Sequence, residues 1–107
     1  MGSPRVGMAR MCVDLSLDAV DSRGGVVQPL DCANARPSAL SIDGGMTWYG
    51  FVLNDSSVDV INPGQTVSCW VSFFNDVDSV SAFPIGASAL FGDGVSTRGV
   101  IRIKAIE

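Results

Sequence analysis

The sequence of 107 residues contains no histidine. A chain without histidine cannot build a Ser-His-Asp or Cys-His catalytic arrangement, a histidine metal site or an imidazole switch near neutral pH. No apolar run approaches the roughly 18–20 residues that a membrane-spanning helix needs, so we expect no membrane partner. Asp14 and Asp18 interrupt the apolar stretch near the N-terminus, which argues against a signal peptide.

The sequence also lacks a phosphate-binding loop motif and the paired-cysteine motifs of zinc sites. The pattern Gly-x-x-x-x-Gly-Lys-Ser/Thr does not occur, so we expect no GTP binding. Cys12, Cys32 and Cys69 form no Cys-x-x-Cys pair and lack the spacing of a zinc site. We interpret them as three reduced thiols of a cytoplasmic protein. A catalytic cysteine would need an arginine, a lysine or a helix N-terminus to lower its pKa.

Cations are scarce relative to carboxylates. Seven Lys+Arg stand against eleven Asp+Glu, for a net charge of −4, which disfavours nucleic acid as the main partner because phosphate binding depends on cations. The acidic loop residues lack the spacing of a calcium-binding loop. We therefore expect solvated carboxylates, no metal, no cofactor and no catalytic residue. The residues considered for a calcium site are Asp55, Asp59, Asp76, Asp78 and Asp93.

What the sequence has is alternation and turn residues. It is 47% hydrophobic with 12 glycines. In its clearest strand, apolar residues on one face (Val67, Cys69, Val71 and Phe73) alternate with Thr66, Ser68, Trp70 and Ser72 on the other. In the last run, Ala105 is expected on the core face. The pattern indicates a small closed barrel or a sandwich, with a flexible tail at 1–7 and one domain at 8–107. Strands are expected at 11–17, 39–42, 46–53, 58–61, 66–73, 85–91 and 96–106, turns at 21–25, 43–45, 62–64 and 92–94, and loops at 31–37 and 75–80.

The order of the turn residues resembles the C-terminal (third) domain of bacterial elongation factor Tu. That domain carries a Gly-Gly-Arg-x-x-Pro turn, an aromatic-Arg-Pro segment, a Met-Pro-Gly turn and a closing hairpin rich in glycine. The resemblance covers nearly the whole chain from Met8, and implies an all-β fold: a small six-stranded antiparallel barrel whose first and last strands lie close together. The matching residues are Gly24, Gly25, Pro29, Arg36, Pro37, Pro63, Gly64, Gly94 and Gly99.

Departures from this pattern bear on function. In the family, basic residues after the glycine pair help the domain touch aminoacyl-tRNA, but this chain has Val26 and Val27 there. Ala35 replaces the aromatic residue before Arg36-Pro37. We therefore expect the inherited RNA contact to be lost.

Two sets of residues are candidates for an interaction surface. Arg98, Arg102 and Lys104 share one face of the last strand, and Arg10 extends this basic stripe if the first strand pairs beside it. The stripe is either a docking face for an anionic partner or the charged face of an outer strand that is kept soluble.

Tryptophans make up the second set. If Tyr49 faces the core, Trp48 and Trp70 point outward on strands that can be neighbours. They are either an interface or a cluster covered by a loop.

The sequence thus predicts a stand-alone, non-catalytic barrel that binds a protein partner or a second copy of itself. The alternative hypothesis is an RNA-binding module that uses the reduced basic stripe. A small-ligand or enzymatic role would require a concave pocket with convergent polar groups.

Overall fold

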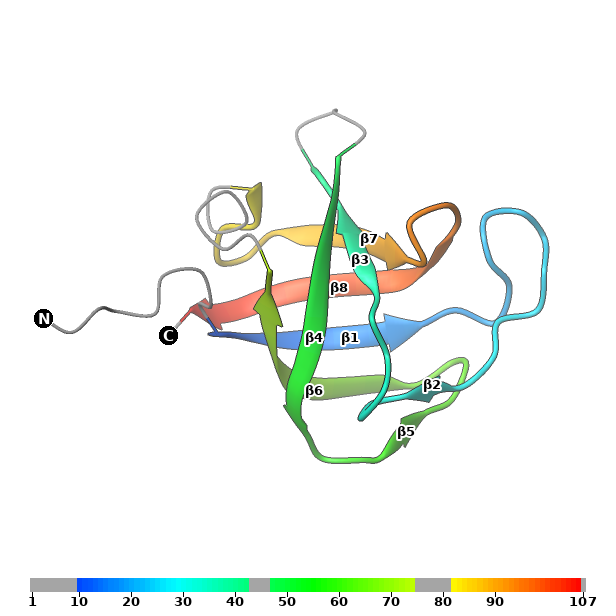
Figure 1. The fold of residues 1–107 in the computed structure, drawn as a ribbon, viewed down its shortest axis with the longest axis horizontal. Coiled ribbons are helices and arrows are strands. Elements are labelled where there is room, and N and C mark those ends of the chain that lie inside the picture. The colour runs from blue at the N-terminus through cyan, green and yellow to red at the C-terminus, as the bar shows by residue number, and fades with distance from the viewer. Residues whose placement is uncertain (1–9, 43–46, 75–81, 107) are drawn as a thin grey trace, which may run out of the picture.

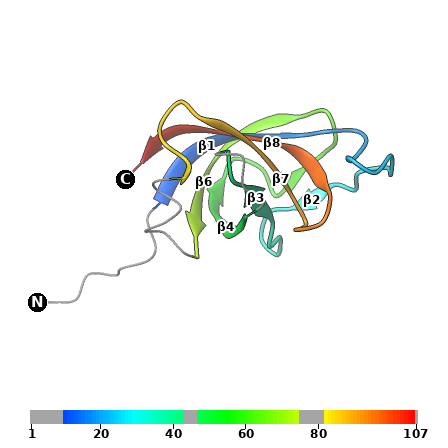
Figure 2. The same cartoon turned by 90° about the horizontal axis from the view of Figure 1, so that it is seen from above.

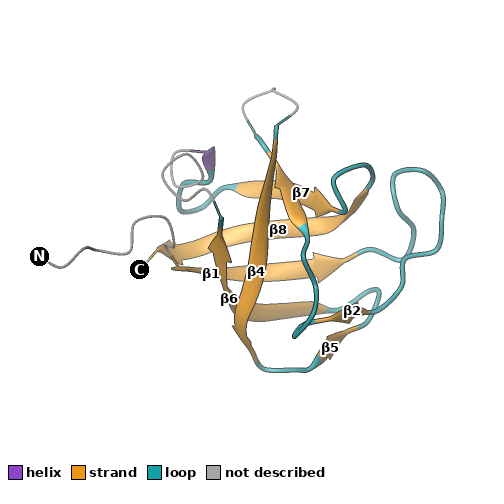
Figure 3. Cartoon of the chain, in the orientation of Figure 1, coloured by secondary structure: helices purple, strands orange, loops and turns teal. Residues whose placement is uncertain are grey.

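A computed structural model describes residues 10–42, 47–74 and 82–106. The expected tail at 1–7, the turn at 43–45 and the loop at 75–80 therefore lie outside the described residues. Strands make up most of the described chain (Figure 3). They are β1 (Arg10–Leu17), β2 (Leu30–Asp31), β3 (Ser38–Leu40), β4 (Trp48–Ser56), β5 (Val60–Ile61), β6 (Thr66–Phe73), β7 (Ser88–Gly92) and β8 (Thr97–Ile106).

Six of these strands close into an antiparallel barrel in the order β1-β6-β4-β3-β7-β8. β1 pairs with β6 on one side and with β8 on the other, so the first and last strands are neighbours (Figure 1). Seen from above, the strands curve around a common interior (Figure 2). The predicted all-β, six-stranded antiparallel barrel is confirmed.

β2 and β5 form a separate two-stranded sheet. Of the run expected at 58–61, only the last two residues are a strand, and Ile61 pairs with Leu30. Ile61 is fully buried and Leu30 packs against the same core. This small sheet therefore extends the hydrophobic core beyond the barrel wall.

Aromatic side chains fill the barrel. Phe51 lies between Phe73 and Phe91, with ring centroids 5.1 and 6.3 Å away. Phe83, which precedes β7, stacks on Phe73 at 5.1 Å and meets the edge of Tyr49 at 5.4 Å. Because its own side chains occupy the interior, the barrel has a packed core, as is usual for barrels of this size.

Register shifts interrupt the strand alternation at three places, and the one at the end of β8 changes which residue faces the core. Val13 on β1 pairs with Ile103 but Cys12 pairs with Ala105, so Lys104 is the extra residue of a β-bulge. A bulge reverses the side-chain alternation that follows it. Ala105 is consequently exposed and Ile106 packs against the core, so the prediction that Ala105 faces inward is wrong.

Glycines have two different roles in the turns and strands. Gly24, Gly64 and Gly94 have φ between 84° and 93°, a conformation that side chains rarely adopt. Residues 62–65 form a type II turn with Pro63 second and Gly64 third. The backbone N–H of Gln65 closes it by donating to the carbonyl of Asn62 at 3.0 Å. Gly25 has no positive φ, so only one member of the predicted glycine pair takes that conformation.

Gly99 is a strand residue rather than a turn residue. It lies inside β8, where a Cβ would collide with the carbonyl oxygen of Ser16 on β1 and approach the Phe91 ring to 2.6 Å. The close contact between β8, β1 and the core therefore requires glycine here. Among the other matching residues, Pro29 precedes β2, and Arg36 and Pro37 lead into β3.

Candidate functional site

The predicted basic stripe lies on β8, but carboxylates neutralise two of its members. Arg98 forms an ion pair with Asp93 at 2.8 Å, and Lys104 forms one with Asp14 on β1 at 3.3 Å. Arg102 is exposed and makes no ion pair within 4 Å among the described residues. The stripe therefore presents less positive charge to a phosphate backbone than its sequence indicates.

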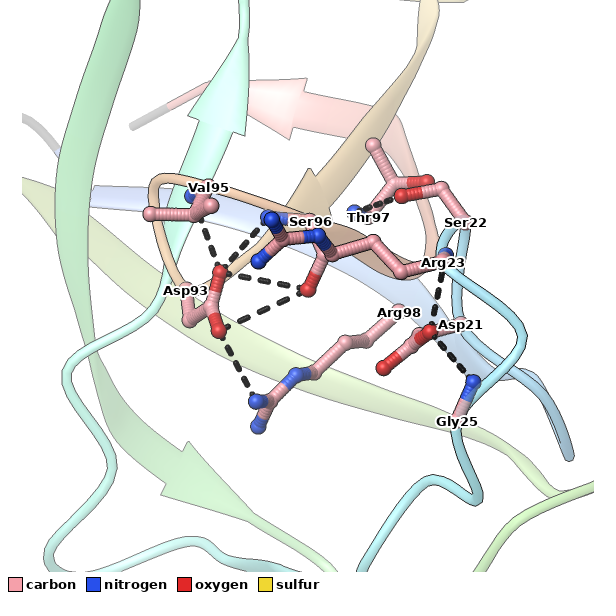
Figure 4. Close-up of polar contacts among 9 residues, drawn as sticks. All are labelled: Asp21, Ser22, Arg23, Gly25, Asp93, Val95, Ser96, Thr97 and Arg98. Atoms are coloured by element: carbon pink, nitrogen blue, oxygen red, sulfur yellow. Dashed lines mark hydrogen bonds and ion pairs between the residues drawn. The ribbon is translucent and has the colours of Figure 1, made fainter.

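Asp93 holds the turn between β7 and β8 together (Figure 4). Its Oδ1 accepts hydrogen bonds from the backbone N–H groups of Val95 at 2.9 Å and Ser96 at 2.8 Å, and its Oδ2 binds Arg98. These backbone donors, assisted by Arg98, lower the pKa of Asp93 to about 2. Arg98 is thus fixed beside this turn.

The turn at 21–25 is attached to the same end of β8. Asp21 accepts from the backbone N–H groups of Arg23 and Gly25, both at 2.8 Å. Ser22 donates its N–H to the carbonyl of Thr97 at 3.0 Å and accepts the N–H of Thr97 on its hydroxyl at 2.9 Å. Two aspartate-organised turns therefore lie next to each other at this end of the barrel (Figure 4).

Asp14 forms a polar cluster with residues of β6 and β8. The Ser68 hydroxyl donates to Asp14 at 2.7 Å, and Lys104 binds the same carboxylate oxygen. The Ser68 hydrogen bond, followed by the effect of Lys104, lowers the pKa of Asp14. This cluster accounts for Lys104 as part of a cross-strand network on the barrel wall.

The two predicted tryptophans occupy different parts of the wall. β4 and β6 are neighbours, as expected, but Trp70 lies opposite Asp55 on β4, seven residues from Trp48. At about 3.3 Å per residue, that separation is roughly 20 Å along the strand. The Arg10 guanidinium lies 4.9 Å from the centre of the Trp70 ring. Arg10 and Trp70 therefore form a pair on β1 and β6, apart from Trp48.

Trp48 belongs instead to a row of apolar side chains on the outside of the barrel. Leu40 on β3 pairs with Trp48, and Leu90 on β7 pairs with Val100 on β8. The pairing of Ala39 with Phe91, continued by one residue, places Leu40 beside Leu90. Leu40, Leu90 and Val100 each stand between two buried residues, and Trp48 precedes Tyr49, which packs against the core, so all four point outward. We call Trp48, Leu40, Leu90 and Val100 the apolar row.

Further apolar side chains flank this row. Ile42, two residues beyond Leu40, is 45% exposed, and Leu90 itself is 46% exposed. Phe74 is 56% exposed and lies against Gly50, the outward neighbour of Trp48 on β4. Exposed apolar patches of this kind are typical of interaction sites, whereas single exposed apolar residues are ordinary.

Of the four residues of the apolar row, only Trp48 is among the surface residues predicted from the sequence; Leu40, Leu90 and Val100 are not. The available signal was that strands 39–42 and 85–91 carry apolar residues on both faces. These outward apolar residues form one row only because β3 pairs with β7, about fifty residues further along the chain. No local sequence pattern reveals that pairing.

The three cysteines make no disulfide. Cys32 and Cys69 are buried, and Cys12 is partly exposed. Burial, with smaller contributions from the other two thiols, raises the pKa of Cys69 to about 12. At neutral pH this thiol is therefore protonated and a poor nucleophile.

In residues 10–42, 47–74 and 82–106, no group of three or more Cys, Asp or Glu side chains is placed to hold a metal ion. The same part of the chain contains no helix that is long and apolar enough to cross a membrane.

No protein-family model matches the chain, and a search of curated proteins finds no match either.

Proposed function

We propose that this protein is a non-catalytic binding module that pairs with a second copy of itself through the apolar row. The observation that carries the proposal is the continuity of apolar side chains over four neighbouring strands. The row contains no charged residue. Two chains of net charge −4 repel each other, and an uncharged face lets them meet with little repulsion.

The order of side chains in the row suits a two-fold axis. An axis that passes between Leu40 and Leu90 brings Trp48 of one copy against Val100 of the other. It also brings Leu40 of one copy against Leu90 of the other. This arrangement is self-complementary, as a symmetric dimer interface must be. Arg98 and Arg102 flank Val100 on β8 and would form part of a polar rim, a common feature of interfaces.

The expected affinity is low. A stable interface contains roughly 20–30 residues per partner, whereas the row with Ile42 and Phe74 supplies six. We therefore expect a dissociation constant between roughly 10 μM and 1 mM, with most of the binding free energy contributed by Trp48.

Sedimentation analysis between 10 μM and 1 mM protein tests the proposal. The wild-type protein should change from monomer to dimer over this range. Leu90→Glu places a charge in the centre of the row, and the variant should stay monomeric. Val95→Glu is the matched control because Val95 is 68% exposed in the turn that follows β7, away from the row.

A wild-type protein that remains monomeric at 1 mM would overturn self-association. Equal dimerisation of the wild type and Leu90→Glu would place the interface elsewhere. RNA binding, the alternative function, is tested by filter binding to structured RNA at two salt concentrations. Tight binding that weakens steeply with salt would overturn the proposed role. The ion pairs of Arg98 and Lys104 favour a protein partner over RNA.

A relationship to the third domain of elongation factor Tu is part of this proposal. It is supported by the six-stranded closure, by the pairing of β1 with β8, and by positive φ at Gly24, Gly64 and Gly94 in the matching turns.

A further inference from the structure

A cavity of about 280 Å³ lies between the segment at 29–37 and the turn that joins β7 to β8. Pro29, Leu30, Pro37 and Phe91 give it an apolar lining. An apolar cavity of about 150 Å³ is large enough for a benzene ring. This cavity therefore has room for one ring together with a polar substituent.

Two carboxylates line the cavity, and hydrogen bonds within their own turns already engage both. Asp31 accepts from the backbone N–H of Ala33 at 3.2 Å and from the side-chain amide of Asn34 at 2.8 Å. Asp93 is held by the backbone of its turn and by Arg98. Neither carboxylate needs a further donor from a ligand.

The two guanidinium groups that line the cavity have donors to spare. A guanidinium carries five N–H donors. Arg36 uses one terminal amino group on the carbonyl of Ala35 at 3.0 Å, and Arg98 uses one on Asp93. The Nε of Arg98 is shielded from solvent, so the donors that Arg98 can offer to a ligand are those of its terminal amino groups. The cavity thus combines satisfied acceptors with an excess of cationic donors.

We propose that this cavity binds a small carboxylic acid that carries one apolar ring. The carboxylate would take the free donors of Arg36 and Arg98, since guanidinium and carboxylate match in geometry and charge. The ring would lie against Phe91 and Pro37. Arg98 also flanks the apolar row, but none of the four residues of the row lines the cavity, so this proposal does not depend on self-association.

Phenylacetate is a suitable probe because it has one ring and one carboxylate. In a titration of ¹⁵N-labelled protein followed by amide chemical shifts, we expect saturable changes at residues 29–37 and 91–98. A probe of this size should bind with a dissociation constant of about 1 mM. Phenylacetamide, which lacks the charge, and acetate, which lacks the ring, should each bind at least tenfold more weakly.

Arg36→Gln separates the proposed site from a general effect of charge. Arg36 is exposed and lies outside the strands, so its replacement should leave the fold intact. We expect the variant to bind phenylacetate at least tenfold more weakly. Arg102→Gln removes an equally exposed arginine that does not line the cavity, and should bind like the wild type.

Three results would overturn the proposal. One is the absence of saturable shifts at 29–37 and 91–98 up to 20 mM phenylacetate, a concentration about twentyfold above the expected dissociation constant. Another is equal affinity for phenylacetate and phenylacetamide, and the third is an equal loss of affinity in Arg36→Gln and Arg102→Gln.

Discussion

At the scale of single residues, aspartates shape the turns of this protein. Asp21, Asp31 and Asp93 each accept a backbone N–H from two residues further along the chain. Asp side chains are favoured in turns because they replace a backbone acceptor in this way. Part of the acidic excess in the sequence is therefore structural, and it fixes the turns around the cavity and the start of β8.

Asp93 should make the stability of the protein depend on pH. Its folded pKa of about 2 lies below the ordinary value of 3.8, so its contribution is present above pH 4 and is lost as pH falls toward 2. The carboxylate is 39% exposed, and solvent screening limits the effect. We expect Asp93→Asn to lower the free energy of unfolding by about 1 kcal/mol at pH 7.

Urea unfolding followed by tryptophan fluorescence at pH 7, 4 and 2 measures this effect. The difference between wild type and Asp93→Asn should shrink as the pH falls and be small at pH 2. Asp59→Asn is the control, because Asp59 is exposed and its carboxylate makes no hydrogen bond among the described residues. A difference for Asp93→Asn that stays constant from pH 7 to pH 2 would contradict the assignment.

At the scale of strands, alternation predicts the elements whose two faces differ. The expected strands at 11–17 and 66–73 correspond to β1 and β6 almost residue for residue, because core-facing apolar residues alternate there with mainly polar ones. The strand expected at 85–91 begins only at Ser88, since the chain first turns at Gly86, where φ is 90°. Apolar residues before that turn gave no sign of it.

Interactions between strands that are distant in the sequence account for what alternation missed. The bulge at Lys104 depends on the register between β8 and β1. The apolar row depends on the pairing of β3 with β7. Phe83 enters the core from outside the strands because the barrel interior has space beside Phe73. None of these features has a local signature in the sequence.

Because of the bulge, we expect a substitution at Ile106 to cost more stability than one at Ala105, the opposite of what uninterrupted alternation predicts. Ile106 packs against the core and Ala105 is exposed. We therefore expect Ile106→Ser to lower the free energy of unfolding by about 2 kcal/mol, mainly through lost apolar burial, and Ala105→Ser to change it by less than about 0.5 kcal/mol. Urea unfolding at pH 7 measures both. A larger cost for Ala105→Ser would mean that the alternation continues without the bulge.

At the scale of the whole molecule, the number of paired residues differs between neighbouring strands of the barrel. β1 pairs with β6 and with β8 over almost its full length. β3 pairs with β7 only at Ser38–Gly92 and Ala39–Phe91. Regions with few hydrogen bonds open at lower free energy than the rest of a domain. The contact between β3 and β7 is consequently the weakest seam of the barrel, and the apolar row crosses it from Leu40 to Leu90.

Hydrogen exchange at this seam links the stability of the barrel to its proposed function. At 10 μM protein, amides that bond across β3 and β7 should exchange through an opening of lower free energy than amides of β1. A second copy seated on the apolar row would hold β3 and β7 together. Protection at the seam should therefore rise several-fold between 10 μM and 1 mM in the wild type. In Leu90→Glu it should stay constant, as it should in β1 of both proteins.

Seam amides that are as protected as those of β1 at 10 μM would show that the barrel opens only as a unit. Protection that rises equally in Leu90→Glu would place the contact between copies away from the row.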